Sequence, residues 1–166
     1  MFSHPGVEEK TVIDINSAIK NTTTVTRNEW KYDAEVILEL DLKNPKILGN
    51  AVDINQVLLN IIVNSAHAIK EAKKSKTIEG IIKITTSTEN GYVLIKIQDN
   101  GCGIPEAISN KVFDHFFTTK EVGKGTGQGL SICHNIITEK HGGQIYFESA
   151  DGAGTTFTIK LKEAEA

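Results

Sequence analysis

Several features that mark specialised proteins are missing from this sequence. Its two cysteines, Cys102 and Cys133, are too few for a disulfide framework and lack the spacing of a metal site. The net charge of −3 argues against a nucleic-acid-binding surface, because such a surface needs an excess of positive charge. No apolar run approaches the roughly 20 residues that span a membrane, and the first residues have neither the basic start nor the apolar stretch of a signal peptide. We therefore expect a cytoplasmic domain that contacts neither nucleic acid nor membrane.

The length of the chain fits one domain. With 166 residues, of which 39% are hydrophobic and 23% charged, the sequence has the composition of a globular protein and is too short for two comfortable domains. We expect a single domain over residues 1–166, with a loose lead-in over residues 1–9 and a frayed tail over residues 162–166.

Patterns of apolar residues divide the chain into short elements. Strands are expected at residues 11–15, 36–42, 81–88, 92–99, 144–148 and 155–161. Helices are expected at about residues 16–30, 53–73 and 129–141, with a further short helix after Pro105. Asn90-Gly91 is typical of a tight hairpin turn. Because helices alternate with strands joined mostly by hairpins, the predicted fold is α+β, a two-layer α/β sandwich: a mixed, mostly antiparallel sheet with helices on one face.

The strand at residues 92–99 ends in an acidic residue on its apolar face. Three aliphatic residues alternate on that face, namely Val93, Ile95 and Ile97. The same alternation places Asp99 toward the core, where a carboxylate is costly unless it meets a hydrogen-bond donor. Gly101 and Gly103 follow directly and allow backbone and ligand to come close. A hairpin turn is the alternative, since Asp-Asn-Gly is also good turn chemistry, and this segment alone leaves both open.

A polar stripe crosses the apolar helix expected at residues 53–73. Its members are spaced four, four and three residues apart: Gln56, Asn60, Asn64 and His67. Asparagine costs a helix interior about half a kcal/mol relative to alanine, and it buries badly unless both ends of its amide find partners. A solvated stripe would explain one asparagine, but two, one turn apart, favour a polar ligand. An amide oxygen suits Mg²⁺ when phosphates supply the charge.

A glycine-rich segment opens directly onto the helix expected at residues 129–141. It reads Gly123-Lys124-Gly125-Thr126-Gly127-Gln128-Gly129-Leu130. The N–H groups and the dipole at a helix start favour anions, and glycines let phosphate oxygens reach the backbone. The segment fits neither the Walker loop nor Gly-x-Gly-x-x-Gly, and a flexible linker is the alternative. We expect residues 113–128 to form a mobile loop.

Taken together, the motifs resemble the ATP-binding catalytic domain of bacterial sensor histidine kinases. In chain order they are Asn60-x-x-x-Asn64, Asp99-x-Gly101-x-Gly103, Phe113-Asp114-x-Phe116-Phe117, the GTGQGL of residues 125–130, and Gly152-x-Gly154-Thr155. The wider superfamily includes gyrase-type topoisomerases, mismatch-repair ATPases and heat-shock chaperone ATPases. The resemblance covers about residues 53–161 and implies a Bergerat-type ATP-binding fold. Residues 116–120 are particularly similar to the nitrogen-regulation and hybrid type of sensor kinase.

The resemblance implies a role for each motif in binding ATP and Mg²⁺. Asp99 would accept a hydrogen bond from the exocyclic amine of adenine, and Asn64 would hold Mg²⁺. Asn60 and His67 would lie close to the phosphates, although the family often has a lysine or another polar group in place of His67. The base site would also include Gly101, Gly103, Ile104 and Thr155. The lid over the triphosphate would consist of Lys120, Lys124, Gly125, Thr126, Gly127, Gln128, Gly129 and Leu130. The catalytic residues implied are Asn60, Lys120 and Lys124.

The resemblance also implies partners beyond this chain. In the family, the γ-phosphoryl group of ATP passes to a histidine on a dimerisation domain, here expected upstream in the same full-length protein, and then to a response regulator. The motif around that histidine does not occur in this sequence, and His115, His134 and His141 are expected to have packing or surface roles. The chain would be the cytoplasmic catalytic module of a longer kinase, whether or not the whole protein is membrane-bound.

Two alternatives stay open at this point. One is an ATP-hydrolysing conformational machine of the gyrase or chaperone type. In those relatives a glutamate one turn before the metal-binding asparagine activates water, whereas this chain has Asn60 there, which cannot act as a base. The other alternative is a non-catalytic module that senses ATP without transferring its phosphate.

Overall fold

The computed structural model describes residues 10–105, 112 and 129–165. Its elements, in chain order, are β1 (Thr11–Asp14), α1 (Ile15–Val25), α2 (Arg27–Trp30), β2 (Ala34–Glu39), β3 (Lys46–Gly49), α3 (Ala51–Ala72), β4 (Gly80–Glu89), β5 (Tyr92–Asp99), α4 (Gly129–Asn135), the π-helix η2 (Ile136–Lys140), β6 (Gln144–Ala150) and β7 (Gly154–Lys162). The predictions of a lead-in over residues 1–9, a helix after Pro105 and a mobile loop over residues 113–128 fall outside the described residues.

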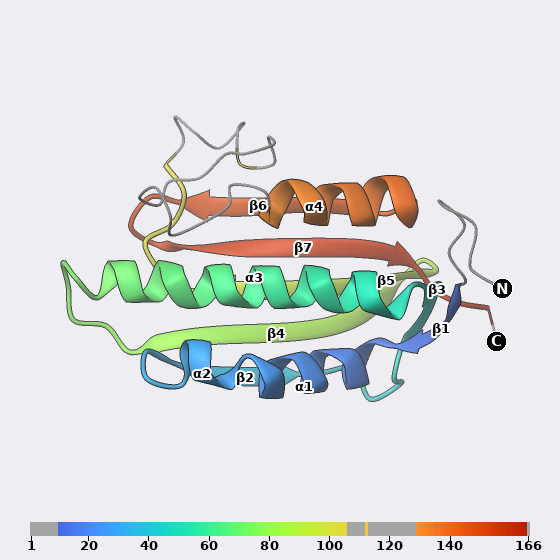
Figure 1. Cartoon of the computed structure of the whole chain (residues 1–166), viewed down its shortest axis with the longest axis horizontal. Helices are drawn as coiled ribbons and strands as arrows, with labels where there is room; N and C mark the ends of the chain where they lie inside the picture. Colours follow the sequence, from blue (N-terminus) through green and yellow to red (C-terminus); the bar gives the residue numbers. More distant parts are fainter. Residues whose placement is uncertain (1–9, 106–111, 113–128, 166) are drawn as a thin grey trace, which may run out of the picture.

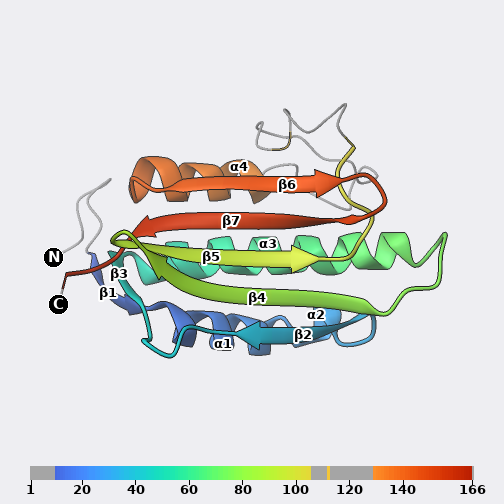
Figure 2. The ribbon, with the colours of Figure 1, turned by 180° about the vertical axis from the view of Figure 1, so that it is seen from behind.

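The elements form two layers. A five-stranded sheet has the strand order β2-β4-β5-β7-β6 and is antiparallel except between β2 and β4. Helices α1, α3 and α4 all lie on one face of this sheet (Figure 1), and the strands face the viewer when the molecule is turned around (Figure 2). A two-stranded sheet of β1 and β3 lies at one end. The predicted two-layer sandwich with a mixed, mostly antiparallel sheet is confirmed.

The core lies between α3 and the sheet. Helix α3 buries a repeating set of side chains at helical spacing: Ile54, Val57, Leu58, Ile61, Ile62, Ser65, Ala66, Ile69 and Ala72. The sheet meets it with alternating residues of its central strands: Ile82, Ile84, Val93, Ile95, Ile97, Phe157 and Ile159. Fully burying one such aliphatic side chain contributes about 1.5–3 kcal/mol. This packing therefore fixes the position of α3 on the face of the sheet.

Side-chain caps and a hairpin turn set several element boundaries. The Asp14 carboxylate accepts a hydrogen bond from the Ser17 N–H at 3.0 Å and so begins α1. The Asn50 side chain accepts from the Asp53 N–H at 3.0 Å and begins α3 two residues before the predicted start. Asn90, in the turn between β4 and β5, has a positive φ of 52°, and its Gly91 neighbour one of 81°, as the predicted tight hairpin requires.

The helix predicted at about residues 16–30 is interrupted at Thr26. Thr22 and Thr26 each donate a hydroxyl hydrogen bond to the backbone carbonyl four residues earlier, at 2.7 and 2.8 Å. Such bonds, in a run of β-branched residues, weaken and bend a helix. The chain resumes as the short helix α2, and the Trp30 indole N–H donates back to the Thr23 carbonyl at 3.2 Å.

Three further boundaries differ from the prediction because of partners distant in the sequence. Strand β2 ends at Glu39, before the predicted residue 42, and two residues further on the N–H of Asp41 donates to the Thr86 hydroxyl at 2.7 Å instead of to the backbone of a neighbouring strand. Strand β3 was not predicted and pairs with β1. The expectation of a frayed tail from Lys162 is wrong as far as Ala164, whose N–H donates to the Lys46 carbonyl at 2.7 Å.

The last helix of the helical layer changes pitch before it ends. The helix predicted at residues 129–141 is α-helical only to Asn135 and continues as the π-helix η2. His141 closes it: its Nδ1 lies 2.8 Å from the Ile136 carbonyl oxygen, and its Nε2 accepts the Asn50 N–H at 3.1 Å. His141 therefore joins η2 to the start of α3, which confirms its predicted packing role.

None of the helices in the described ranges is both long and apolar enough to cross a membrane.

Candidate nucleotide-binding site

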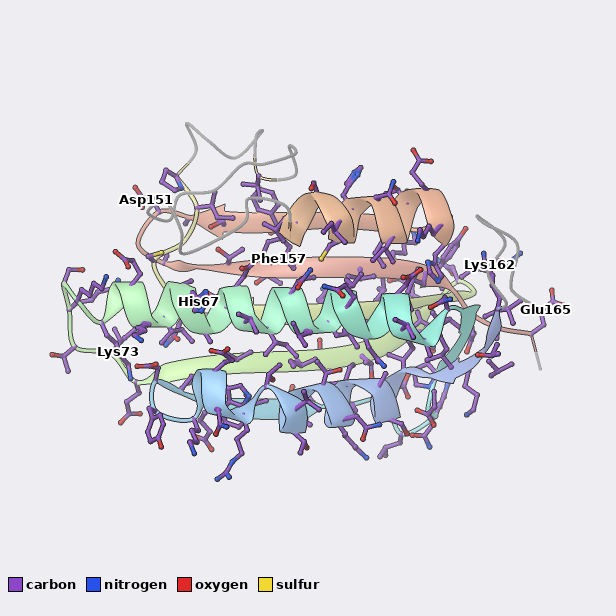
Figure 3. The ribbon with its side chains drawn as sticks, viewed as in Figure 1. His67, Lys73, Asp151, Phe157, Lys162 and Glu165 are labelled. Carbon is purple, nitrogen blue, oxygen red and sulfur yellow. The ribbon has the colours of Figure 1, made fainter. Side chains whose placement is uncertain are left out.

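The predicted inward carboxylate lies at one end of the sheet. Asp99 is the last residue of β5, and only 5% of its surface is exposed. It pairs with Thr155 at the start of β7 and accepts a hydrogen bond from the Gly101 N–H at 2.9 Å. This end of the molecule also carries Asp151, in the β6–β7 turn, as Figure 3 shows. The alternation that predicted an inward Asp99 is confirmed.

The surroundings of Asp99 leave its charge only partly compensated. Burial raises the pKa of Asp99 from 3.8 to about 6, and the hydrogen bond from the Gly101 N–H, with the nearby Ser65 side chain and Thr155 backbone, acts in the opposite direction. The carboxylate is therefore mostly ionised at neutral pH. It is an acceptor in a site with little water, which is the position of a group that recognises an N–H donor.

Ser65 is a residue that the sequence interpretation missed. It lies on the buried face of α3, with 1% of its surface exposed, and its hydroxyl is near enough to Asp99 to lower the pKa of that carboxyl. Within the described residues, no group lies at hydrogen-bonding distance and geometry from this hydroxyl. A polar residue on the apolar face of a helix was the signal that could have identified it.

The glycines around Asp99 bring chain segments together. A side chain at Gly101 would place its Cβ 2.5 Å from the backbone of Ala68 on α3. A side chain at Gly154 would collide with the backbone of Asp99, and Gly103 is equally crowded by the end of β6. Gly103 and Gly154 also have positive φ values of 76° and 104°. The close approach predicted from these glycines is confirmed for the backbone, whereas their contact with a ligand stays a prediction.

A serine hydroxyl joins the three segments that border Asp99. Ser149, near the end of β6, accepts a hydrogen bond from the Ile104 N–H at 2.6 Å and donates to the Gly154 carbonyl at 3.0 Å. Its Oγ also lies 2.9 Å from the Thr155 Oγ1. Sequence reasoning missed Ser149, although counting back through the β6–β7 hairpin places it opposite Thr155.

Two other connections hold this end of the molecule in place. The Asn100 side chain accepts from the Ile81 N–H at 2.8 Å and donates to the Glu79 carbonyl at 2.7 Å, which fixes the start of β4 beside the end of β5. The backbone of Cys102 bridges α3 and the β6–β7 turn: its N–H donates to the Ala68 carbonyl, and its carbonyl accepts from the Gly152 N–H. Asn100 was also missed, because its partners come from another strand.

The asparagine stripe of α3 runs toward this end. Asn60 donates to the Gly129 carbonyl at 3.3 Å, so the structure brings together two predicted phosphate-binding residues from α3 and α4. Gln56 donates to the Asn60 oxygen at 3.4 Å. Asn64 and His67 are half-buried further along α3, and Figure 3 shows His67 on that helix. Because Asn64 directly precedes Ser65, it lies on α3 at the level of Asp99.

The remaining predicted site residues fall into two groups. Ile104, predicted to wall the base, and Leu130, predicted in the lid, are both half-buried and pack against the core. Six residues of the predicted lid lie outside the described residues: Lys120, Lys124, Gly125, Thr126, Gly127 and Gln128. The structure therefore pairs Asp99 with Thr155, places Asn60 and Asn64 one turn apart on α3, and leaves the lid as a prediction.

Comparison with known proteins identifies the family. The family described as histidine kinase-, DNA gyrase B-, and HSP90-like ATPase matches residues 49–165. The chain belongs to this family.

Two curated relatives of this ATPase domain are sensor kinases. Sensor kinase CckA of Brucella abortus (strain 2308) is 41% identical over 168 residues, a match that covers 96% of this chain and 18% of CckA. Signal transduction histidine-protein kinase AtoS of Escherichia coli (strain K12) is 35% identical over 162 residues, covering 96% of this chain and 25% of AtoS. The chain thus spans a quarter or less of the length of these relatives.

Solved structures show the same catalytic domain. The catalytic domain of histidine kinase ThkA has a TM-score of 0.78 and 30% identity to this chain, with 94% of this chain and 97% of that domain covered. ThkA in complex with the response regulator protein TrrA has a TM-score of 0.71 and 26% identity, with 93% of this chain and 42% of ThkA covered. The resemblance to the catalytic domain of sensor histidine kinases is confirmed, and with it the use of ATP by this family.

Proposed function

We propose that this domain binds ATP with Mg²⁺ and transfers the γ-phosphoryl group to a histidine on a separate dimerisation domain of the same longer protein. The observation that carries the proposal is the buried Asp99 carboxylate, held beside Thr155 at the level of Asn64 on α3. A carboxylate at one end of the sheet and a row of amides along α3 supply the two kinds of contact that a nucleotide needs: one for its base and one for its phosphates.

Adenine suits the Asp99 end of the site. Its exocyclic amine donates two hydrogen bonds, and the ionised carboxylate still has acceptor capacity beyond the Gly101 N–H. Guanine has a carbonyl oxygen in place of this amine. A carbonyl there would face a buried carboxylate without a hydrogen between them, which costs about 1–3 kcal/mol for the unpaired groups.

The amides of α3 suit the phosphate end. The Asn64 side-chain oxygen is a hard, neutral ligand of the kind that Mg²⁺ accepts when phosphates carry the negative charge. When bound, Mg²⁺ neutralises charge on the triphosphate during transfer. The Asn60 amide is oriented by its hydrogen bond to Gly129, which ties it to the start of α4. His67, the lysines Lys120 and Lys124, and the amides of residues 125–130 complete the phosphate contacts in this proposal.

Transfer to a histidine requires little acid–base chemistry from this domain. A nitrogen of the acceptor imidazole attacks the γ-phosphorus, the N–P bond forms as the P–O bond to ADP breaks, and the imidazole proton passes to solvent. The protein contributes positioning and charge neutralisation. Asn60 has no group that could take a proton from water, so the site favours transfer over hydrolysis.

The partners follow from the family. ThkA forms a complex with a response regulator, and we propose that the phosphohistidine made by this domain is likewise passed on to a response regulator. Since ATP is the phosphoryl donor, we place this step in the cytoplasm.

The proposal can be tested by following the fate of the γ-phosphate. The domain is incubated with γ-labelled ATP, Mg²⁺ and the dimerisation domain of its longer protein. The expected product is an acid-labile, base-stable phosphohistidine on that domain, which disappears in Asp99→Asn. Steady release of phosphate without labelling would support a hydrolysing machine instead. Tight ATP binding with neither labelling nor hydrolysis would support a sensing module.

A further inference from the structure

The hydroxyl of Ser149 makes three polar contacts, and the chemistry of its neighbours fixes most of their direction. The Ile104 N–H, 2.6 Å away, can only donate. The Gly154 carbonyl, 3.0 Å away, can only accept. The Thr155 hydroxyl, 2.9 Å away, can do either. A serine hydroxyl has one hydrogen to give. When that hydrogen goes to the Gly154 carbonyl, the hydrogen between the two hydroxyls has to come from Thr155.

The direction of this hydrogen matters because Thr155 borders the carboxylate. Asp99 and Thr155 are directly opposite each other on neighbouring strands, so their side chains share a face. Both are 5% exposed. The backbone of Thr155, rather than its hydroxyl, is what lowers the pKa of Asp99. The Thr155 hydroxyl hydrogen is thus directed from β7 to Ser149 on β6, and its oxygen lone pairs remain for a ligand beside Asp99.

We propose that Ser149 is a specificity-determining positioning residue: it takes the Thr155 hydroxyl hydrogen, so that Thr155 and Asp99 offer the base only hydrogen-bond acceptors. Such a pair selects a purine with an amine at position 6 and rejects one with a carbonyl there. Without Ser149, the Thr155 hydroxyl would be free to turn and donate to a carbonyl. This inference rests on the proposed function, since it concerns the purine of the same nucleotide.

The test compares ATP with inosine triphosphate, whose base has a carbonyl in place of the amine. Dissociation constants for both nucleotides are measured by calorimetry with Mg²⁺ for the wild-type domain, S149A, T155V and the double variant S149A/T155V. We expect S149A to lower the preference for ATP over inosine triphosphate at least about fivefold. This is the effect expected when the Thr155 hydroxyl can donate a hydrogen bond to the carbonyl at position 6. In the T155V background, S149A should change the preference less than about twofold, because no hydroxyl is left to reorient.

Two comparisons separate this role from a merely structural one. S149T keeps the hydroxyl and should keep the wild-type preference, even if both affinities change. If Ser149 only held Ile104 in place, S149A would weaken the binding of both nucleotides equally and leave the ratio of their dissociation constants unchanged. That result would overturn the inference. So would an equal change of the ratio in the presence and absence of the Thr155 hydroxyl. If the wild-type domain binds neither nucleotide, the proposed function fails as well, whereas tight ATP binding with an unaltered ratio in S149A defeats only the role of Ser149.

Discussion

Replacing Asp99 by asparagine should stabilise the nucleotide-free domain while abolishing ATP binding. The substitution keeps the shape of the side chain and removes its charge. Its remaining oxygen can still accept the Gly101 N–H, now at 2.9 Å from the carboxylate. The new amide hydrogens can be donated to the Ser65 hydroxyl, which has no partner in the described part of the chain. The amide has only one acceptor oxygen, however, so it cannot accept from both the Gly101 N–H and the adenine amine as the two carboxylate oxygens can.

The expected gain in stability follows from the pKa of Asp99. Burial raises this pKa from 3.8 to about 6, and each unit corresponds to about 1.4 kcal/mol. Between about pH 4 and pH 6 the folded state keeps a proton that the unfolded chain has lost, so stability falls as the pH rises through this range and stays low above it. At pH 7 the charge therefore costs about 3 kcal/mol. Because burying an amide also has a cost, we expect the asparagine variant to be more stable by about 1–3 kcal/mol.

Urea unfolding at pH 7 and at pH 5, without nucleotide, measures this difference. The advantage of Asp99→Asn should shrink at pH 5, where most of the wild-type side chain is already neutral. Asp151→Asn, an exposed acidic residue in the β6–β7 turn, is the matched control and should alter neither stability nor ATP binding. The reasoning is refuted if Asp99→Asn is no more stable than the wild type at pH 7, or if calorimetry finds its ATP affinity unchanged.

Three further outcomes are expected. ATP affinity, measured by calorimetry from pH 5 to pH 8, should weaken about tenfold per pH unit below about pH 6, as Asp99 is protonated; a flat profile would contradict its role as the acceptor. Asn64→Ala should lower ATP affinity about tenfold in Mg²⁺ but change it little in chelator, and equal losses in both would rule out a metal contact. Ser65→Ala should move the pH midpoint of ATP binding upward, since the hydroxyl lowers the pKa of Asp99; an unmoved midpoint would count against that contact.

Much of the site could be predicted because its signals are local. The alternation along β5 was enough to place Asp99 in the core, and the Asn60–Asn64 spacing was enough to set both amides on one face of α3. The hairpin at Asn90-Gly91 was likewise visible, since few other residues accept its backbone conformation. In each case the structural consequence depends on residues within about two turns of one another.

The parts that were missed depend on partners far along the chain. Strand β3 has only four residues and exists because it pairs with β1. The roles of Asn100 and Ser149 come from contacts with another strand and with the neighbouring loop. The pitch change at Ile136 adds no break in the apolar pattern of the last helix, so periodicity could not reveal it. Local patterns thus placed Asp99 in the core and the two asparagines on one face of α3, but did not show what holds them in position.

The tight packing of Gly101, Gly103 and Gly154 has a consequence for genetic work on this kinase family. An added Cβ at any of these glycines would lie at most 2.5 Å from backbone atoms of neighbouring segments. A substitution at one of them would push these segments apart, so a loss of function in such a variant would say nothing about catalysis. Isosteric substitutions at an existing side chain, such as Asp99→Asn, can instead distinguish an inactive domain from a misfolded one.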